Sequence, residues 1–332
     1  METFKYTKVA AVPEAIRTAA QANTAQQGAR FIAGGTTLLD LMKLNVERPT
    51  QLIDINRLPL DQVEKLPDGR LKIGALVRNS DLAHHPAVMS DYSVLSQALL
   101  SGASAQLRNM ATTGGNLLQR TRCMYFRNDA MACNKRDPGS GCSAIEGDNR
   151  TLAILGTSKD CIATNPSDMN VALTALETTI HIQGPKGERD VPIGEFFLTP
   201  GNTPQRENVL EPGELITFVI LPAPRANSKQ VYLKLRDRAS YEFALSSAAI
   251  VAEVSGGKLV FIRVALGGVG TKPWRSLEAE KVLHGKTVDD KTFLQAAEAA
   301  LHGAQPQSEN AFKVPLAKRC ITHALTLATK TA

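Results

Sequence analysis

The clearest pattern of apolar and polar positions lies in the last third of the chain. Residues 232–235, 246–254 and 258–269 alternate between apolar and polar side chains, and a Ser-Gly-Gly turn separates the last two segments. This alternation predicts antiparallel strands, because successive side chains of a strand point to opposite faces of its sheet. Helical spacing follows at residues 276–283, 289–301 and 314–329. These segments together predict a small C-terminal α+β domain.

The rest of the chain mixes shorter helices and strands. The apolar spacing predicts helices at residues 13–25, 38–43, 91–100 and 171–176. It predicts strands at residues 30–33, 51–56, 71–74, 179–183 and 214–221, with a hairpin turn around residues 67–69. The Pro-rich stretch at residues 221–228 has the composition of a linker. We therefore expect two domains, at residues 1–222 and 228–330.

Composition narrows the possible functions. The chain has 332 residues, 43% of them hydrophobic and 21% charged, and its formal net charge is +6. The basic residues are not interleaved with aromatic ones as on a nucleic-acid-binding face, so we expect no nucleic-acid partner. No apolar run reaches the length of about 18 residues that indicates a membrane span, and the first residues lack a signal-peptide pattern. We expect neither a membrane anchor nor an export signal in this chain.

Two Gly-Gly motifs, each flanked by threonines, are candidate ligand contacts. The first, Ala33-Gly34-Gly35-Thr36-Thr37, lies between a predicted strand and a predicted helix. In such a turn, backbone N–H groups can approach an anion closely and the helix N-terminus adds a favourable dipole. The second is Thr112-Thr113-Gly114-Gly115-Asn116. The two motifs could hold one extended ligand at two points, and the alternative is that each is a plain tight turn.

Four of the five cysteines lie within 39 residues, with the spacing C-x9-C-x8-C-x18-C: Cys123, Cys133, Cys142 and Cys161. Two disulfides, a zinc ion or an iron–sulfur cluster could staple this loop, and four unrelated thiols are the ordinary alternative. Zinc sites usually contain closely spaced cysteine pairs, which are absent from this sequence, and disulfides predominate in small secreted domains. Cys320 lies in a predicted C-terminal helix and is expected to be a free, partly buried thiol.

Five sequence segments, in this order, resemble the flavin subunit of the molybdenum hydroxylases, the family of xanthine dehydrogenases, carbon monoxide dehydrogenase and aldehyde oxidoreductases. They are FIAGGTTLLDLMK, LRNMATTGGN, PSDMNVALTAL, VLEPGELI and YLKLRDRASYEFALSSAA. The resemblance covers nearly the whole chain. It implies an α+β fold, with a two-part FAD-binding domain of the vanillyl-alcohol-oxidase type and a C-terminal domain like that of the CO-dehydrogenase flavoprotein. The cysteine insertion, at about residues 119–163, is similar to that of a subgroup, the periplasmic aldehyde oxidoreductases, which carry a [4Fe-4S] cluster in this subunit.

The resemblance also implies roles for individual residues. Asp168 would bind the polar portion of FAD, although Ser167 or Asp168 is also a natural N-cap for the following helix. Leu210 would pack on the isoalloxazine and Lys234 would approach the flavin ring, although a buried leucine and a solvated strand lysine are ordinary features. The cluster ligands would be the four clustered cysteines named above. The remaining FAD contacts would come from both glycine motifs: Phe31, Ile32, Ala33, Gly34, Gly35, Thr36, Thr37, Leu38, Thr112, Thr113, Gly114, Gly115 and Asn116.

The function implied by the resemblance is electron transfer. Substrate would be oxidised at a molybdenum-cofactor centre in a large subunit, and electrons would pass through a small [2Fe-2S] subunit to FAD in a heterotrimer. No catalytic residue for the aldehyde is expected in this chain. The alternatives are a self-sufficient FAD-dependent oxidase, a flavin subunit of a xanthine dehydrogenase type, and a zinc-stapled scaffold. The resemblance implies a periplasmic location reached by export together with a signal-bearing partner; a cytoplasmic complex is the alternative.

Overall fold

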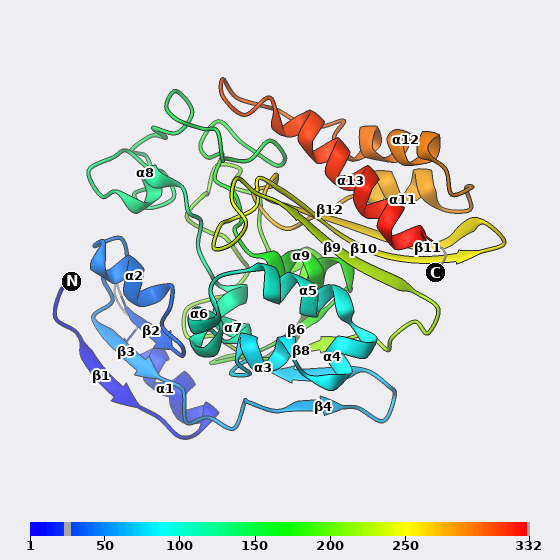
Figure 1. Cartoon of the computed structure of the whole chain (residues 1–332). Coiled ribbons are helices and arrows are strands. Elements are labelled where there is room, and N and C mark those ends of the chain that lie inside the picture. Colours follow the sequence, from blue (N-terminus) through cyan, green and yellow to red (C-terminus); the bar gives the residue numbers. More distant parts are fainter. Residues whose placement is uncertain (23–27, 331–332) are drawn as a thin grey trace.

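The computed structural model describes residues 1–22 and 28–330, and its N-terminal part is a small parallel sheet (Figure 1). Its central strand, β3 (Gln51–Asp54), is buried along its whole length between β1 (Lys5–Lys8) and β2 (Ala29–Ile32). Two helices accompany the sheet, α1 (Val12–Ala22) and α2 (Leu38–Lys43). The helix predicted at residues 13–25 is therefore present as far as Ala22, and its last predicted residues lie outside the described ones.

A second sheet has five antiparallel strands in the order β4-β5-β8-β6-β7. Its strands are β4 (Val63–Lys65), β5 (Leu71–Gly74), β6 (Thr179–Gly184), β7 (Gly187–Pro192) and β8 (Leu215–Leu221). Helices between these strands in sequence are α3 (Asn79–Ala83), α4 (Pro86–Asp91), α5 (Ser93–Ser101), α6 (Ala105–Met110), α7 (Thr113–Leu117), α9 (Asp168–Ala175) and α10 (Ile193–Phe196).

The C-terminal part is a four-stranded antiparallel sheet with three helices (Figure 1). The strands are β9 (Lys229–Leu235), β10 (Ser246–Ser255), β11 (Lys258–Gly267) and β12 (Trp274–Arg275). The helices are α11 (Leu277–Leu283), α12 (Asp290–Ala300) and α13 (Lys313–Thr329).

The alternation along β10 explains how this sheet joins two cores. Ala248 and Ile250 pack with α11, α12 and α13, whereas Ala249 and Val251 point to the other face. There they meet α5 and α9, and the same apolar cluster continues to the five-stranded sheet. Because side chains of a strand alternate between faces, a strand buried on both sides is continuously apolar, as β10 is at residues 248–252. Helices α5 and α9 are thus enclosed between the two antiparallel sheets.

The cysteine segment, residues 119–163, contains one short helix, α8 (Met124–Arg127), and lies between α2 and the C-terminal helices (Figure 1). An apolar cluster that includes Leu41 and Phe126 forms its core. Its end is held by the buried side chain of Lys313, whose Nζ donates to the carbonyls of Thr151 at 3.0 Å and Leu152 at 2.8 Å. The same ammonium reaches the carbonyl of Gly268 at 2.5 Å, so α13 joins this segment to the turn after β11.

The predicted fold class is confirmed: mixed helices and antiparallel sheets form an α+β molecule. Across the described ranges, no helix is both long enough and apolar enough to cross a membrane.

Candidate functional site

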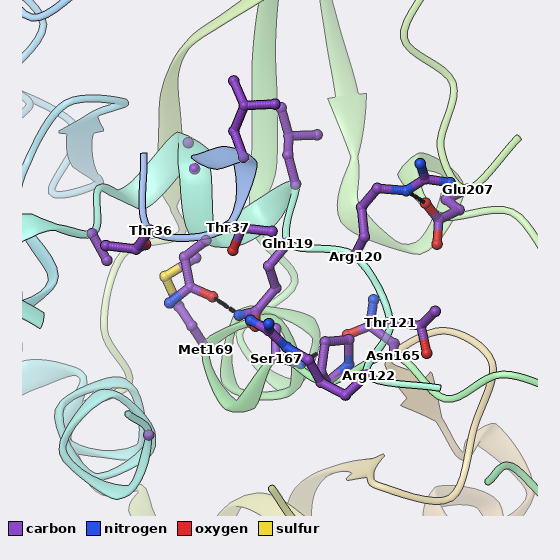
Figure 2. A pocket seen from close by; sticks show the side chains of 18 of the residues that line it. Thr36, Thr37, Gln119, Arg120, Thr121, Arg122, Asn165, Ser167, Met169 and Glu207 are labelled. Atoms are coloured by element: carbon purple, nitrogen blue, oxygen red, sulfur yellow. Dashed lines mark hydrogen bonds and ion pairs between the residues drawn. The ribbon is translucent and has the colours of Figure 1, made fainter. Parts of the chain in front are cut away.

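The main cavity of the molecule lies where the N-terminal part, the five-stranded sheet and the C-terminal part meet, and has a volume of about 1390 Å³. Ligand pockets for small molecules typically measure roughly 300–1,000 Å³, so this cavity has room for an extended dinucleotide. Figure 2 shows part of its lining, with Thr36 and Thr37 on one side and Arg120 and Glu207 on the other.

The first glycine motif packs directly against the end of α6, which precedes the second glycine motif in the sequence. Gly35 has a φ of +70°, a conformation that L side chains rarely adopt. A Cβ added to Gly34 would lie only 1.9 Å from the carbonyl oxygen of Met110. Glycine is therefore required at both positions, once for conformation and once for space. The prediction that the two motifs face one ligand site agrees with their joint presence in the cavity wall.

The second motif is a short helix rather than an open turn. Gly114 and Gly115 lie within α7, and the Thr112 Oγ1 accepts a hydrogen bond from the Gly115 N–H at 3.2 Å as its N-cap. A Cβ on Gly114 would lie 3.1 Å from the Cβ of Ala75, so the glycine permits close packing on the end of β5. The second motif was expected to be a glycine turn, and this expectation is corrected: it begins the helix α7. The Thr112 side chain caps that helix, a role that the Thr-Thr-Gly-Gly sequence does not reveal by itself.

The start of α9 is tied to α7 by side chains. Ser167 is the N-cap of α9, and its Oγ accepts from the Asn170 N–H at 3.0 Å. The Ser167 hydroxyl also lies 2.7 Å from the Oδ1 of Asn116, which belongs to α7. Ser167, rather than Asp168, therefore caps this helix, and the Asp168 side chain is left for another role.

Asp168 is buried in the cavity wall and paired with a lysine. Its Oδ2 lies 2.7 Å from Lys234 Nζ, and the side chains are only 9% and 4% exposed. Its Oδ1 accepts from the hydroxyl of Tyr232 at 2.5 Å. Burial, and next the charge of Asp168, raise the pKa of Tyr232 well above its usual range, so the phenol remains protonated.

A chain of alternating charges runs from the cavity wall, at Glu47, Arg120 and Glu207, to Lys135. Arg120 Nε lies 2.5 Å from Glu207 Oε2, and its Nη1 lies 2.5 Å from Glu47 Oε1. Glu207 Oε1 in turn lies 3.1 Å from Lys135 Nζ. Lys135 lines a second, small cavity, which is also lined by the four clustered cysteines. Burial alone would raise the pKa of Glu207, but Arg120 and Lys135 hold it below its usual range. These ion pairs join the wall of the main cavity to the cysteine segment.

Two further arginines leave donors free at the cavity. Arg127 Nη2 pairs with Asp40 Oδ2 at 2.6 Å, and Arg122 Nη1 lies 3.4 Å from the same oxygen. In the part of the chain that the structure describes, Arg122 Nε and Arg127 Nη1 are buried without a hydrogen-bond partner. Buried donors normally have partners, so these are candidate contacts for an anionic ligand.

The four clustered cysteines line one small cavity of about 10 Å³. All are free thiols, and Cys133 and Cys142 face each other in an isolated antiparallel bridge. Burial raises the pKa of Cys123 to about 12 and also raises the pKa of Cys142 and Cys161. Among the described residues, no three or more His, Cys, Asp or Glu side chains are arranged to hold a metal ion. Cys320 is buried in α13, apart from this group.

The sequence matches two family models in succession. Residues 2–224 match the FAD binding domain in molybdopterin dehydrogenase, and residues 231–328 match the CO dehydrogenase flavoprotein C-terminal domain. The chain belongs to this family. It is an FAD-binding subunit of the molybdopterin dehydrogenases, and the predicted resemblance is confirmed.

Relatives of this FAD-binding subunit match over almost their full length. The aldehyde oxidoreductase FAD-binding subunit PaoB of Escherichia coli (strain K12) is 50% identical over 98% of both chains. The glyceraldehyde dehydrogenase medium chain of Sulfolobus acidocaldarius is 29% identical over 92% of this chain and 90% of its own. The solved carbon monoxide dehydrogenase of Hydrogenophaga pseudoflava superposes with a TM-score of 0.77 and 27% identity, covering 98% of this chain and 97% of that one.

In this flavin subunit, all but one of the residues predicted to contact FAD line the main cavity. The exception is Thr113, whose Oγ1 donates to the carbonyl of Val77 at 3.1 Å, away from the cavity. Leu210 is half-buried at the edge of the large core, where it can pack on a planar ligand. Which of these residues touch FAD stays a prediction. The sequence interpretation missed Tyr232, although its place two residues before Lys234 on a strand puts both on one face.

Proposed function

We propose that the chain is the FAD and [4Fe-4S] electron-transfer subunit of a molybdenum-containing aldehyde oxidoreductase. The observation that carries this proposal is the full-length identity of 50% with a protein named as the FAD-binding subunit of an aldehyde oxidoreductase. The cavity supports it, because its lining combines both glycine motifs, the Asp168–Lys234 pair and the free guanidinium donors.

FAD in this cavity would supply a group that accepts single electrons and delivers two. The turn at Gly34-Gly35 would offer its backbone N–H groups to the pyrophosphate. The N–H groups of Gly114 and Gly115 at the start of α7 already donate to Ala75 and Thr112, so α7 would contribute close packing rather than donors. The free donors of Arg122 and Arg127 suit the same negative charge. Leu210 would cover the isoalloxazine, Lys234 would approach the flavin ring, and Asp168 would bind the polar portion of FAD.

The donor set of the cysteine cavity supports an iron–sulfur cluster, and the thiols would have to rearrange around it, because as placed they are not arranged to hold a metal ion. Cys123, Cys133, Cys142 and Cys161 supply four thiols around one position, and Lys135 and Arg120 bring positive charge to the same region. The space of about 10 Å³ admits little more than one water, so the thiol side chains would open outward around a cluster. A cluster would also hold the cysteines as thiolates, against the burial that raises the pKa of Cys123, Cys142 and Cys161.

The partners would be a large molybdenum-cofactor subunit and a small [2Fe-2S] subunit. Three of the matched relatives are named as medium chains, which supports a complex of several subunits. We place the working complex in the periplasm, reached by export with a signal-bearing partner. Cell fractionation with and without the signal of the partner tests this, and a chain that stays in the cytoplasm beside the intact partner would refute it.

A visible spectrum with iron, zinc and flavin analysis of the purified chain tests the cofactor proposal. We expect a yellow-brown protein with one FAD and four irons per chain. A colourless protein with stoichiometric zinc would instead identify a zinc-stapled scaffold. A self-sufficient oxidase would bleach its flavin when the isolated chain is mixed with aldehyde under nitrogen. We expect no bleaching until the molybdenum and [2Fe-2S] subunits are added.

A further inference from the structure

Tyr232 lies directly behind the wall of the main cavity. Its side chain is buried, and its hydroxyl lies between two cavity-lining groups, 2.5 Å from Asp168 Oδ1 and 2.9 Å from Ser247 Oγ. Tyr232 itself is not part of the lining. The phenol can therefore act on a ligand only through the residues that it holds.

The direction of these hydrogen bonds follows from the protons available. A phenol has one proton, and an ionised carboxylate only accepts, so the Tyr232 hydroxyl donates to Asp168. The hydroxyl of Ser247 then donates to the phenol oxygen. The result is a directed chain from Ser247 through Tyr232 to Asp168, and it begins and ends in the cavity wall.

The carboxylate is fixed from both sides. Tyr232 holds Oδ1, while Lys234 holds Oδ2 at 2.7 Å and also donates to the carbonyl of Ser101 at 3.1 Å. Space around Oδ2 is limited, because even a Cβ on Gly102 would come within 3.2 Å of it. Asp168 therefore has one orientation, in which each oxygen has a donor on the protein side and free electron pairs for a ligand.

We propose that Tyr232 is a positioning residue of the flavin site, whose hydroxyl fixes Asp168 for the polar groups of the bound flavin. This inference rests on the proposed function, in which the cavity holds FAD. Loss of the hydroxyl would leave Oδ1 without its donor and free the carboxylate to turn toward Lys234. Binding FAD would then require Asp168 to be reordered, and affinity falls when a site is not preorganised.

The test compares Tyr232→Phe with Tyr92→Phe in the full chain. Tyr92 is a matched control: it is equally buried, and its hydroxyl donates to the carbonyl of Pro222 at 2.7 Å outside the cavity. Each variant loses one buried hydroxyl and its hydrogen bond. FAD affinity is measured by fluorescence titration of the deflavinated protein, together with the visible spectrum of the bound flavin.

We expect Tyr232→Phe to bind FAD about fivefold to tenfold more weakly, with a shifted flavin spectrum, and Tyr92→Phe to match the wild type. In the background of Asp168→Ala, Tyr232→Phe should cause no further loss of FAD affinity, because the residue through which it acts is gone.

Unchanged affinity and spectrum in Tyr232→Phe would overturn the inference, as would an equal effect of Tyr92→Phe. A further loss in the Asp168→Ala background would also overturn it, by showing that Tyr232 acts through general stability. These outcomes differ from a failure of the proposed function, in which the wild-type chain itself would take up no FAD.

Discussion

Substitution of individual cysteines can show whether the four clustered thiols bind a cluster or are merely buried. If Cys123, Cys133, Cys142 and Cys161 are the ligands, each change to serine should reduce bound iron strongly, because a serine hydroxyl is a poor substitute for a thiolate. Cys320→Ser is the control, since it removes a buried thiol from α13, apart from the cluster. Iron analysis of the five purified variants measures the effect, and iron loss in the control alone would contradict the assignment.

The sequence indicated the residues of local motifs but not those whose partners are distant in the chain. Glycine motifs, the Ser167 cap and the cysteine cluster are each visible within a few consecutive positions. Tyr232 bonds to a residue 64 positions away, and Arg120 pairs with Glu207 across 87 positions. Such pairs arise only from packing, because a single tyrosine or arginine carries no local signal of its partner.

At the scale of elements, the contact between the first glycine motif and the end of α6 can be tested at Gly34. In Gly34→Ala the new methyl group would overlap the carbonyl of Met110, 1.9 Å from the added Cβ, and force the turn away from α6. We expect a loss of about 1–3 kcal/mol in stability and a lower ratio of flavin to protein.

Gly194→Ala is the matched control for this change, since no heavy atom lies within 4 Å of a Cβ at that position and the backbone there needs no glycine conformation. It should keep full flavin. If Gly34→Ala also binds flavin fully and melts normally, the close approach of these two elements has no importance for the site.

The attachment of the cysteine segment depends on the half-buried carboxylate of Glu207 and therefore on pH. Glu207→Gln removes the charge that pairs with Arg120 and Lys135, and we expect a loss of about 2 kcal/mol at neutral pH. Because the folded pKa of Glu207 lies below its usual 4.5, its stabilisation is present above pH 4.5 and is lost as the pH falls through the folded pKa.

Thermal melting from pH 7 to pH 3 measures this dependence. The difference between wild type and Glu207→Gln should shrink below pH 4.5. Glu64→Gln serves as the control, because Glu64 is 58% exposed and its contact with Lys72 is a surface pair, whose removal should have little effect at any pH. A constant difference between wild type and Glu207→Gln at every pH would show that the charge of Glu207 is unimportant.

Helices and strands were predicted best where burial of one face makes apolar residues recur at regular intervals along the sequence. The three long strands and three helices of the C-terminal part were expected at nearly their observed positions, because alternation and helical spacing are strong there. Strands β1 and β7 were missed. Both lie at sheet edges and have the mostly exposed sequences KYTK and GERDVP, so hydrogen bonding to a neighbour, rather than an apolar pattern, makes them strands.

At the scale of the whole molecule, the two family-matched regions share the larger of the hydrophobic cores. Residues of β10 and β11 pack on α5 and α9, which belong to the N-terminal region, and the same cluster continues to the five-stranded sheet. Lys313 adds polar contacts from α13 to the cysteine segment and to Gly268 in the cavity wall. The main cavity also takes its walls from both regions, so ligand binding and domain packing depend on each other.

This shared core predicts that the full chain unfolds in a single step. Separating the C-terminal region would expose Tyr232, Ala249 and Val251, which are buried against the helices of the other region. Exposed apolar surface of this kind costs about 25 cal/mol per Å², so neither region should be stable alone. Calorimetry of the full chain should show one transition, and FAD should raise its midpoint, since a ligand stabilises the state that binds it. Two separate transitions, with only the first moved by FAD, would show that the regions fold independently and that the cavity belongs to the N-terminal one.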